Sequence, residues 1–149
     1  MNENEMKFLV NDLTFIDQAT KIFEIKQGYL NRDKERTVRI RIQNQDAFIT
    51  VKGASEMVNG IDSRYEWEKS IDLSDAISMM KLCEGVVEKT RYIVPYSDYT
   101  IEVDMFKNID LIIAEVEFVD CDEIDMDVPD WFGKNVTGVV EYYNSNLGN

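Results

Sequence analysis

Charged side chains recur at every second position in several segments of this chain. Glu3, Glu5 and Lys7 alternate with other residues in one segment, and Arg39 and Arg41 do so in another. Side chains two positions apart on a β-strand lie on the same face, about 6.6 Å apart along it. The spacing therefore predicts strands that each carry one charged and one largely apolar face. The whole charged set comprises Glu3, Glu5, Lys7, Arg39, Arg41, Lys52, Arg64, Glu66, Glu68, Lys89, Arg91, Glu102, Asp104, Glu115 and Glu117.

This set contains eight acids and seven bases, so it is nearly neutral in a chain whose net charge is −13. Arginine forks and lysine ammonium groups match phosphoryl oxygens, whereas paired carboxylates suit a hard cation such as Mg²⁺ or Mn²⁺. Phosphoryl transfer needs mainly positioning and neutralisation of charge. The pattern therefore favours a site for an anionic phosphate chain with a divalent metal. A plain amphipathic sheet with a solvated outer face would also alternate in this way.

Several function classes are excluded by composition. The chain contains no histidine, which removes Ser-His and Cys-His nucleophile systems and histidine zinc sites. The negative net charge argues against nucleic acid and membrane surfaces as partners. Cys83 and Cys121 form no CxxC pair and are expected to be buried thiols. The N-terminal residues lack the pattern of a signal peptide, so we expect a cytoplasmic protein.

The hydrophobic periodicity predicts a mostly antiparallel α+β domain spanning residues 1–149. We expect helices at about 12–23 and 73–84 and a C-terminal helix from about Val136. The second helix is expected to begin at Asp72 or Ser74 and to stop near Gly85. We expect strands at about 3–10, 37–43, 47–52, 64–71, 86–94, 99–106 and 111–119.

Taken in order, these segments resemble the CYTH domain, or triphosphate tunnel metalloenzyme, family. Its E-x-E-x-K signature is matched by Glu3-Asn4-Glu5-Met6-Lys7, and the resemblance covers essentially the whole chain. Further matching segments are Gln27-Gly28-Tyr29-Leu30, Arg36–Arg41, Thr50–Gly53, Arg64–Glu68, Lys89–Arg91, Glu102–Asp104, Ala114–Phe118, Pro129–Gly133 and Tyr143–Leu147. In two places the chain departs from the family pattern. Thr37 stands where the first of three alternating bases is common, and Val139-Val140-Glu141 stands where a basic residue commonly precedes the terminal Tyr-Asn segment.

The resemblance implies a single domain that forms a closed eight-stranded antiparallel β-barrel, or tunnel, with flanking helices and a C-terminal helix. A triphosphate would lie lengthwise in the tunnel. By similarity, the metal ligands are Glu3, Glu5, Glu115 and Glu117. The substrate would be held by Lys7, Arg39, Arg41, Lys52, Arg64, Lys89 and Arg91. A catalytic set that positions a second metal or water would comprise Glu66, Glu68, Glu102 and Asp104, with Glu5 acting in catalysis as well.

The resemblance further implies Mg²⁺- or Mn²⁺-dependent hydrolysis of inorganic tripolyphosphate or a nucleoside triphosphate. Two alternatives stay open: a class IV-type adenylate cyclase, and a polyphosphate- or nucleotide-binding module with weak turnover. We expect a monomer or homodimer that acts on a small-molecule triphosphate. Tyr29 is expected in a loop, either near the tunnel mouth or as a packing residue. Ile40, Trp67, Val103 and Phe118 are expected to face outward and form the core.

Overall fold

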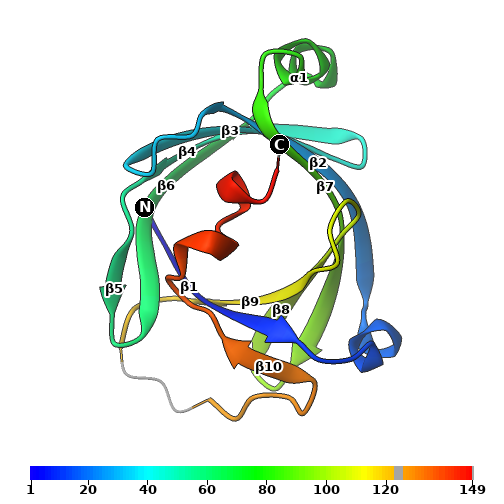
Figure 1. Cartoon of the computed structure of the whole chain (residues 1–149), viewed down its shortest axis with the longest axis vertical. Helices are drawn as coiled ribbons and strands as arrows, with labels where there is room; N and C mark the ends of the chain where they lie inside the picture. The colour runs from blue at the N-terminus through cyan, green and yellow to red at the C-terminus, as the bar shows by residue number, and fades with distance from the viewer. Residues whose placement is uncertain (123–125, 149) are drawn as a thin grey trace.

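In the computed structural model, which describes residues 1–122 and 126–148, ten strands form one antiparallel sheet that curls into a barrel (Figure 1). The order is β10-β1-β9-β8-β7-β2-β3-β4-β6-β5, and β1 also pairs with β6, which closes an eight-stranded barrel. β5 and β10 lie outside that closed ring. The strands are β1 (Asn2–Val10), β2 (Lys21–Asn31), β3 (Arg36–Gln43), β4 (Asp46–Gly53), β5 (Glu56–Val58), β6 (Ile61–Ser70), β7 (Glu84–Tyr96), β8 (Tyr99–Phe106), β9 (Ile112–Phe118) and β10 (Phe132–Asn135).

The predicted fold class is confirmed, but the first predicted helix is wrong. A short 3-10 helix, η1 (Thr14–Gln18), is followed by the long strand β2. β2 pairs with β3 on one side and with β7 on the other. The two ladders supply hydrogen bonds to the backbone N–H and C=O groups of β2. This pairing outweighs the helix-like spacing of apolar residues in the sequence. The segment Gln27–Leu30 consequently lies in a central strand and not in a loop.

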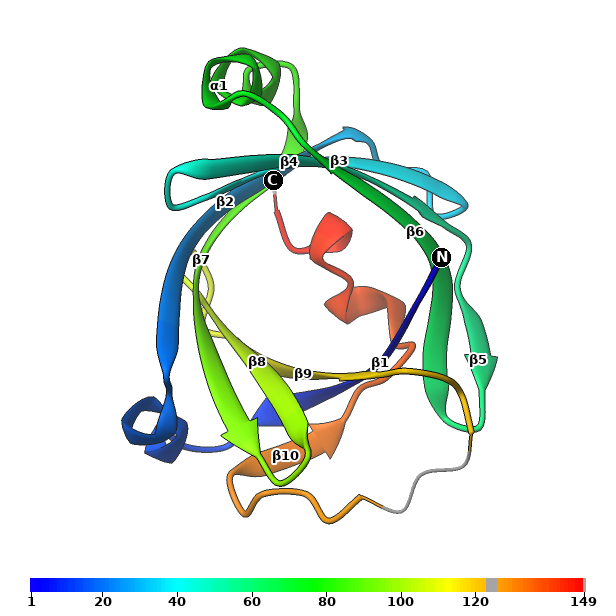
Figure 2. The ribbon, with the colours of Figure 1, turned by 180° about the vertical axis from the view of Figure 1, so that it is seen from behind.

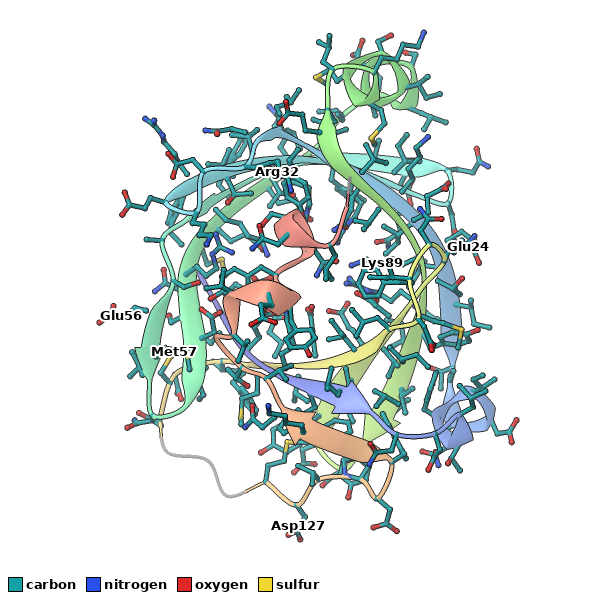
Figure 3. All side chains as sticks on the ribbon, viewed as in Figure 1. Glu24, Arg32, Glu56, Met57, Lys89 and Asp127 are labelled. Atoms are coloured by element: carbon teal, nitrogen blue, oxygen red, sulfur yellow. The ribbon has the colours of Figure 1, made fainter. Side chains whose placement is uncertain are left out.

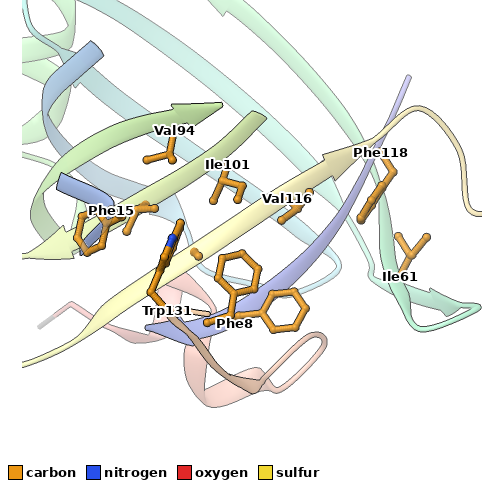
Figure 4. Close-up of a cluster of buried hydrophobic side chains, with 11 residues drawn as sticks. Phe8, Phe15, Ile61, Val94, Ile101, Val116, Phe118 and Trp131 are labelled. Atoms are coloured by element: carbon orange, nitrogen blue, oxygen red, sulfur yellow. The ribbon is translucent and has the colours of Figure 1, made fainter. Parts of the chain in front are cut away.

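Two of the three apolar clusters lie on the outside of the barrel wall, because most of the inner face is charged. The third, formed by Val87, Phe106 and Ile113, packs against Tyr142 and Leu147 of the C-terminal segment. Figure 4 shows Phe8, Val116 and Phe118 along the wall, with Phe15 and Trp131 at the opposite end of the cluster from Phe118. The rings of Phe15 and Trp131 lie 5.6 Å apart between centroids. On the other side of the barrel, helix α1 (Leu73–Met80) covers Ile40 with Ala76 and Met80.

The outward orientation predicted for the aliphatic and aromatic set is largely confirmed. Ile40, Val103 and Phe118 are buried in the clusters beneath the covering segments. Trp67 is the exception, since it is 44% exposed. Neither η1, β10 nor α1 covers its part of the wall, so the core there is thinner than the pattern predicts.

The C-terminal segment crosses the interior of the barrel instead of forming the predicted helix. It contains two 3-10 turns, η2 (Val140–Tyr142) and η3 (Asn144–Asn146), after Gly138 at a φ of 73°. The front and back views both place this segment within the ring of strands (Figures 1 and 2). In the described part of the chain, no helix has both the length and the apolar character needed to cross a membrane.

Candidate active site

The inward-facing side chains of the barrel strands line one cavity of about 210 Å³. Figure 3 shows Lys89 directed into the ring of strands. Most of the lining side chains are charged, so the cavity suits a small ionic ligand better than an apolar one. The lining comprises Glu3, Glu5, Lys7, Tyr29, Thr37, Arg39, Arg41, Lys52, Asp62, Arg64, Glu66, Glu68, Lys89, Arg91, Glu102, Glu115, Glu117, Tyr143, Asn144 and Ser145.

Acids and bases are divided between two walls of this cavity. All the acids in the lining lie on β6, β1, β9 and β8, which are neighbours in the barrel. The opposite run of neighbours, β7, β2, β3 and β4, contributes five bases and no acid from the described residues. Lys7 and Arg64 are the bases on the acidic wall. An anion can therefore lie along one wall and a cation along the other.

Arg41 is a cation on the basic wall that is held by an amide and by no carboxylate among the described residues. Its Nε and Nη2 donate to Oε1 of Gln27 at 3.0 and 2.9 Å. Burial and the neighbouring guanidinium groups of Arg39 and Arg91 lower the pKa of Arg41 to about 9. The lowered pKa reflects positive charge that lacks a counter-ion in this wall, which is the condition an anionic ligand would relieve.

Arg91 and Lys89 are anchored by Asp104. Arg91 donates from Nε and Nη2 to the two oxygens of Asp104 at 2.8 and 2.9 Å, and Lys89 lies 2.7 Å from the same carboxylate. Asp104 is 1% exposed. Burial raises the pKa of Asp104, but Arg91 and Lys89 outweigh this and hold it well below its usual range. Asp104 thus fixes two bases of the wall from behind.

On the acidic wall, carboxylates crowd one another. Burial, Glu115 and Glu3 together raise the pKa of Glu5 well above its usual range. Burial and Glu3 raise the pKa of Glu66 to about 7. Lys52 lies 2.7 Å from Glu3 and 3.5 Å from Glu66, so it neutralises part of this group. The wall carries more negative charge than its bases compensate.

The C-terminal segment supplies oxygens to two bases of the cavity, Lys7 and Lys89, and to Arg32 outside its lining. Lys7 Nζ donates to the carbonyl of Tyr142 at 3.1 Å, and Lys89 Nζ donates to Oδ1 of Asn144 at 2.7 Å. Arg32 donates twice to the carbonyl of Ser145, at 3.0 and 2.8 Å, and lies beside the segment in Figure 3. These neutral oxygens accept hydrogen bonds from groups that would also bind phosphate oxygens.

The CYTH domain family model matches residues 1–143. The chain belongs to the CYTH domain family. It is 40% identical to an inorganic triphosphatase of Acetivibrio thermocellus, over 97% of this chain and 92% of that protein. The crystal structure of the inorganic triphosphatase NE1496 matches with a TM-score of 0.69 and 31% identity, over 97% of this chain and 95% of that one. HpAC1 from Hippeastrum, described as a putative adenylyl cyclase with a dominant triphosphatase activity, shares the fold at 14% identity, with a TM-score of 0.66 over 79% of this chain and 80% of that one.

The CYTH barrel brings the site residues predicted from the sequence into one cavity, with one exception. Asp104 lies behind Arg91 and Lys89 and does not line the cavity, so its place is that of a positioning residue. Tyr29, expected in a loop, is a buried cavity residue on β2. Thr37 occupies its predicted slot, and Nη2 of Arg64 approaches its hydroxyl at 3.4 Å.

Asp62, Gln27 and the C-terminal residues Tyr143 and Asn144 were missed by sequence reasoning. A signal for Asp62 exists, because it shares the parity of Arg64 and Glu66 one step earlier on β6, where the predicted strand began too late. Gln27 was missed because β2 was predicted as helix and loop. Nothing in the local pattern around Tyr143 and Asn144 indicates that they enter the barrel.

The acids of the CYTH site fit a divalent cation that brings some of its own ligands. In residues 1–122 and 126–148, no three Asp, Glu, His or Cys side chains converge at the spacing of a complete metal site. Mg²⁺ is usually held by one or two carboxylates, with waters and substrate phosphate oxygens in the other positions. Glu5, whose raised pKa reflects burial and repulsion by Glu115 and Glu3, has the character expected of such a ligand.

Proposed function

We propose that this protein hydrolyses a triphosphate, most favourably inorganic tripolyphosphate, with the help of Mg²⁺ or Mn²⁺. The observation that carries the proposal is the division of the cavity into an acidic and a basic wall. A phosphate chain on the basic wall and a cation against the acidic wall would neutralise both. The 40% identity to an inorganic triphosphatase supports the same reaction.

The bases have the role of holding the phosphate chain. Arg39, Arg41, Lys52, Lys89 and Arg91 come from neighbouring strands and would neutralise charge on successive phosphoryl groups. Asp104 keeps the Arg91 guanidinium and the Lys89 ammonium in place by the contacts described above. Lys7 and Arg64 would contribute from the other wall.

The acids have the role of holding the cation and orienting water. Glu3, Glu5, Glu115 and Glu117 are the proposed metal ligands, and Glu66, Glu68 and Glu102 would accept hydrogen bonds from water near the phosphate chain. When bound, the metal neutralises developing charge on the phosphoryl oxygens and lowers the pKa of coordinated water. The closed wall limits access of bulk water, which strengthens each of these interactions.

The cavity lining also bears on the alternatives. It is almost wholly charged or polar, with Tyr29 and Tyr143 as its aromatic members. This favours an inorganic triphosphate over a nucleotide and disfavours the cyclase. We further propose a single domain over residues 1–149 that acts in the cytoplasm as a monomer or homodimer. Support for that location comes from Cys83 and Cys121, which form no disulfide.

The experiment is a side-by-side measurement of phosphate release from tripolyphosphate, ATP and pyrophosphate with Mg²⁺ or Mn²⁺, and then with EDTA. We expect release from tripolyphosphate well above release from ATP, and its loss in EDTA. Conversion of ATP to cyclic AMP and pyrophosphate, with tripolyphosphate inert, would replace the proposal by the cyclase. Tight tripolyphosphate binding with no release would leave a binding module.

A further inference from the structure

Asp62 is a buried acid of the cavity with an unused oxygen. Its side chain lines the cavity from β6, and the residue is 3% exposed. Oδ2 accepts a hydrogen bond from the Tyr143 hydroxyl at 2.9 Å, whereas Oδ1 is buried with no hydrogen-bond partner among the described residues. A buried carboxylate oxygen without a donor is unfavourable, so this oxygen is available to a hydrogen-bond donor or a cation.

The register of three neighbouring strands of the acidic wall, β6, β1 and β9, shows what kind of ligand this oxygen suits. Glu5 on β1 faces Asp62 on β6 and also faces Glu117 on β9, so three carboxylates form one row across the wall. The rows on either side each combine an acid and a base. Glu3 faces Arg64 in one of them, and Lys7 faces Glu115 in the other. The middle row contains three acids and no base.

The nearby bases already have partners. Lys7 Nζ donates to the Tyr142 carbonyl and lies 3.7 Å from Glu115. Arg64 Nε donates to the carbonyl of Gly53 at 3.0 Å. An anion would be repelled by the row, since like charges at such spacing are unfavourable. The ligand that suits this oxygen is therefore a cation, or a water molecule that the cation coordinates.

Spacing supports a shared cation. Directly opposed residues of an antiparallel pair have Cβ atoms about 4.5–5.5 Å apart and point to the same face. The carboxylates of Glu5 and Asp62 can thus converge on one ion at the bond lengths of about 2.0–2.1 Å that Mg²⁺ requires. The remaining ligands would be water and substrate oxygens, in keeping with the lack of a complete three-residue site in the described chain.

We infer that Asp62 is a further ligand of the divalent cation, which it holds together with Glu5 through its free Oδ1, directly or through one coordinated water. The inference rests on the proposed function, because it requires a divalent cation in the barrel. It extends the metal set predicted from the sequence to a third strand, β6, on the far side of β1 from Glu117.

Mn²⁺ binding to the whole chain, followed by the electron paramagnetic resonance signal of free Mn²⁺, tests this inference without turnover. Asp62→Asn should weaken Mn²⁺ binding about tenfold or more. Tyr143→Phe removes the hydroxyl bonded to Asp62 but leaves the carboxylate, and should bind Mn²⁺ at least as tightly as the wild type, because both oxygens of Asp62 are then free for the cation. Asp110→Asn removes an exposed acid and is the matched control for net charge.

A second measurement separates a ligand from a structural residue. In EDTA, Asp62→Asn should unfold at the same urea concentration as the wild type or a higher one, because one uncompensated charge is removed and the amide oxygen still accepts the Tyr143 hydrogen bond. Loss of folding of Asp62→Asn in EDTA, or unchanged Mn²⁺ affinity in the folded variant, would overturn this inference but leave the proposed function standing. Failure of the wild-type protein to bind Mn²⁺ would overturn the metal-dependent function as well.

Discussion

Arg91 meets Asp104 through two parallel hydrogen bonds, and its third nitrogen, Nη1, lies 3.1 Å from Glu102. Three of the five N–H donors of this guanidinium group are therefore engaged by acids of β8 before any substrate arrives. Arg41 on β3, by contrast, is held by the neutral Gln27. Two arginines of the basic wall thus differ in how far their positive charge is already neutralised, and Arg41 keeps more of it for an anion.

Asp104→Asn should strongly destabilise the fold. The substitution leaves Arg91 and Lys89 buried without their shared counter-ion, and removal of one partner of a buried ion pair costs about 3–5 kcal/mol. Urea denaturation measures the loss. Glu102→Gln is the control, since Glu102 is partly exposed and should cost about 1 kcal/mol or less. Equal stability of the two variants would contradict a structural role for the Asp104 fork.

The contribution of Asp104 should depend on pH in a defined direction. Burial raises its pKa, but Arg91 and Lys89 hold it below the ordinary value of about 3.9. A carboxyl with a depressed pKa stabilises the fold above its unfolded pKa, and this stabilisation is lost as the pH falls towards the folded value. The stability gap between the wild type and Asp104→Asn should shrink as the pH falls from about 5 to below about 4. A stability gap that widens as the pH falls would contradict a lowered pKa for Asp104.

Arg41→Ala should chiefly weaken substrate binding. Hydrogen bonds to a charged group contribute about 1.5–3 kcal/mol, so we expect KM for tripolyphosphate to rise about 10- to 100-fold. Initial rates over a range of substrate concentrations separate KM from kcat. Arg36→Ala provides the control, because Arg36 is exposed and pairs with Asp33 on the surface. A fall in kcat with KM unchanged would place Arg41 in the chemical step instead.

Glu115→Gln should abolish metal-dependent turnover and leave the fold intact. The amide cannot replace the carboxylate as a hard anionic ligand, and we expect a loss of about 100-fold or more in kcat. Glu5→Gln should behave in the same way. Far-ultraviolet circular dichroism reports folding, and phosphate release reports activity. Glu88→Gln, on the exposed face of β7, should retain full activity. Unchanged turnover in both Glu5→Gln and Glu115→Gln would refute the metal assignment.

Gly28→Ala should destabilise the contact between β2 and the segment after α1. A Cβ at residue 28 would lie 2.6 Å from Cβ of Cys83 and 3.1 Å from the sulfur of Met80. Overpacking of this kind typically costs about 1–3 kcal/mol. Gly53→Ala is the comparison, since the corresponding distance there is 3.4 Å to Tyr65 Cβ. Thermal unfolding of the two variants should rank Gly28→Ala as the less stable.

The charged face of the barrel could be predicted from the sequence because strand alternation is a local property. A residue such as Glu117 faces the lumen whenever its strand runs straight, and parity alone places it there. β2 was not predicted because its sequence has an approximate helical stripe. Its pairing with β3 and β7, which lie elsewhere in the sequence, makes it a strand instead. The entry of Tyr143 into the lumen depends on contacts with Asp62 and Ser55, which no local pattern encodes.

A small error in the predicted start of β6 removed Asp62 from the predicted site. The predicted strand began at Arg64, whereas β6 begins at Ile61, and that difference is within the ordinary uncertainty of strand ends. It nevertheless excluded a cavity residue from the predicted site. The row formed by Asp62, Glu5 and Glu117 becomes visible when the register between strands is known.

The position of β1 between β6 and β9 also has a consequence for folding during synthesis. Glu5 leaves the ribosome early, but its two cross-strand neighbours, Asp62 and Glu117, follow far later in the chain. At about 5–20 residues per second, the first strand waits on the order of ten seconds for β9. Until then it is an open edge available to other chains. Closure of the ring is therefore a late, long-range event, and we expect folding on the slow millisecond-to-second scale typical of such topologies.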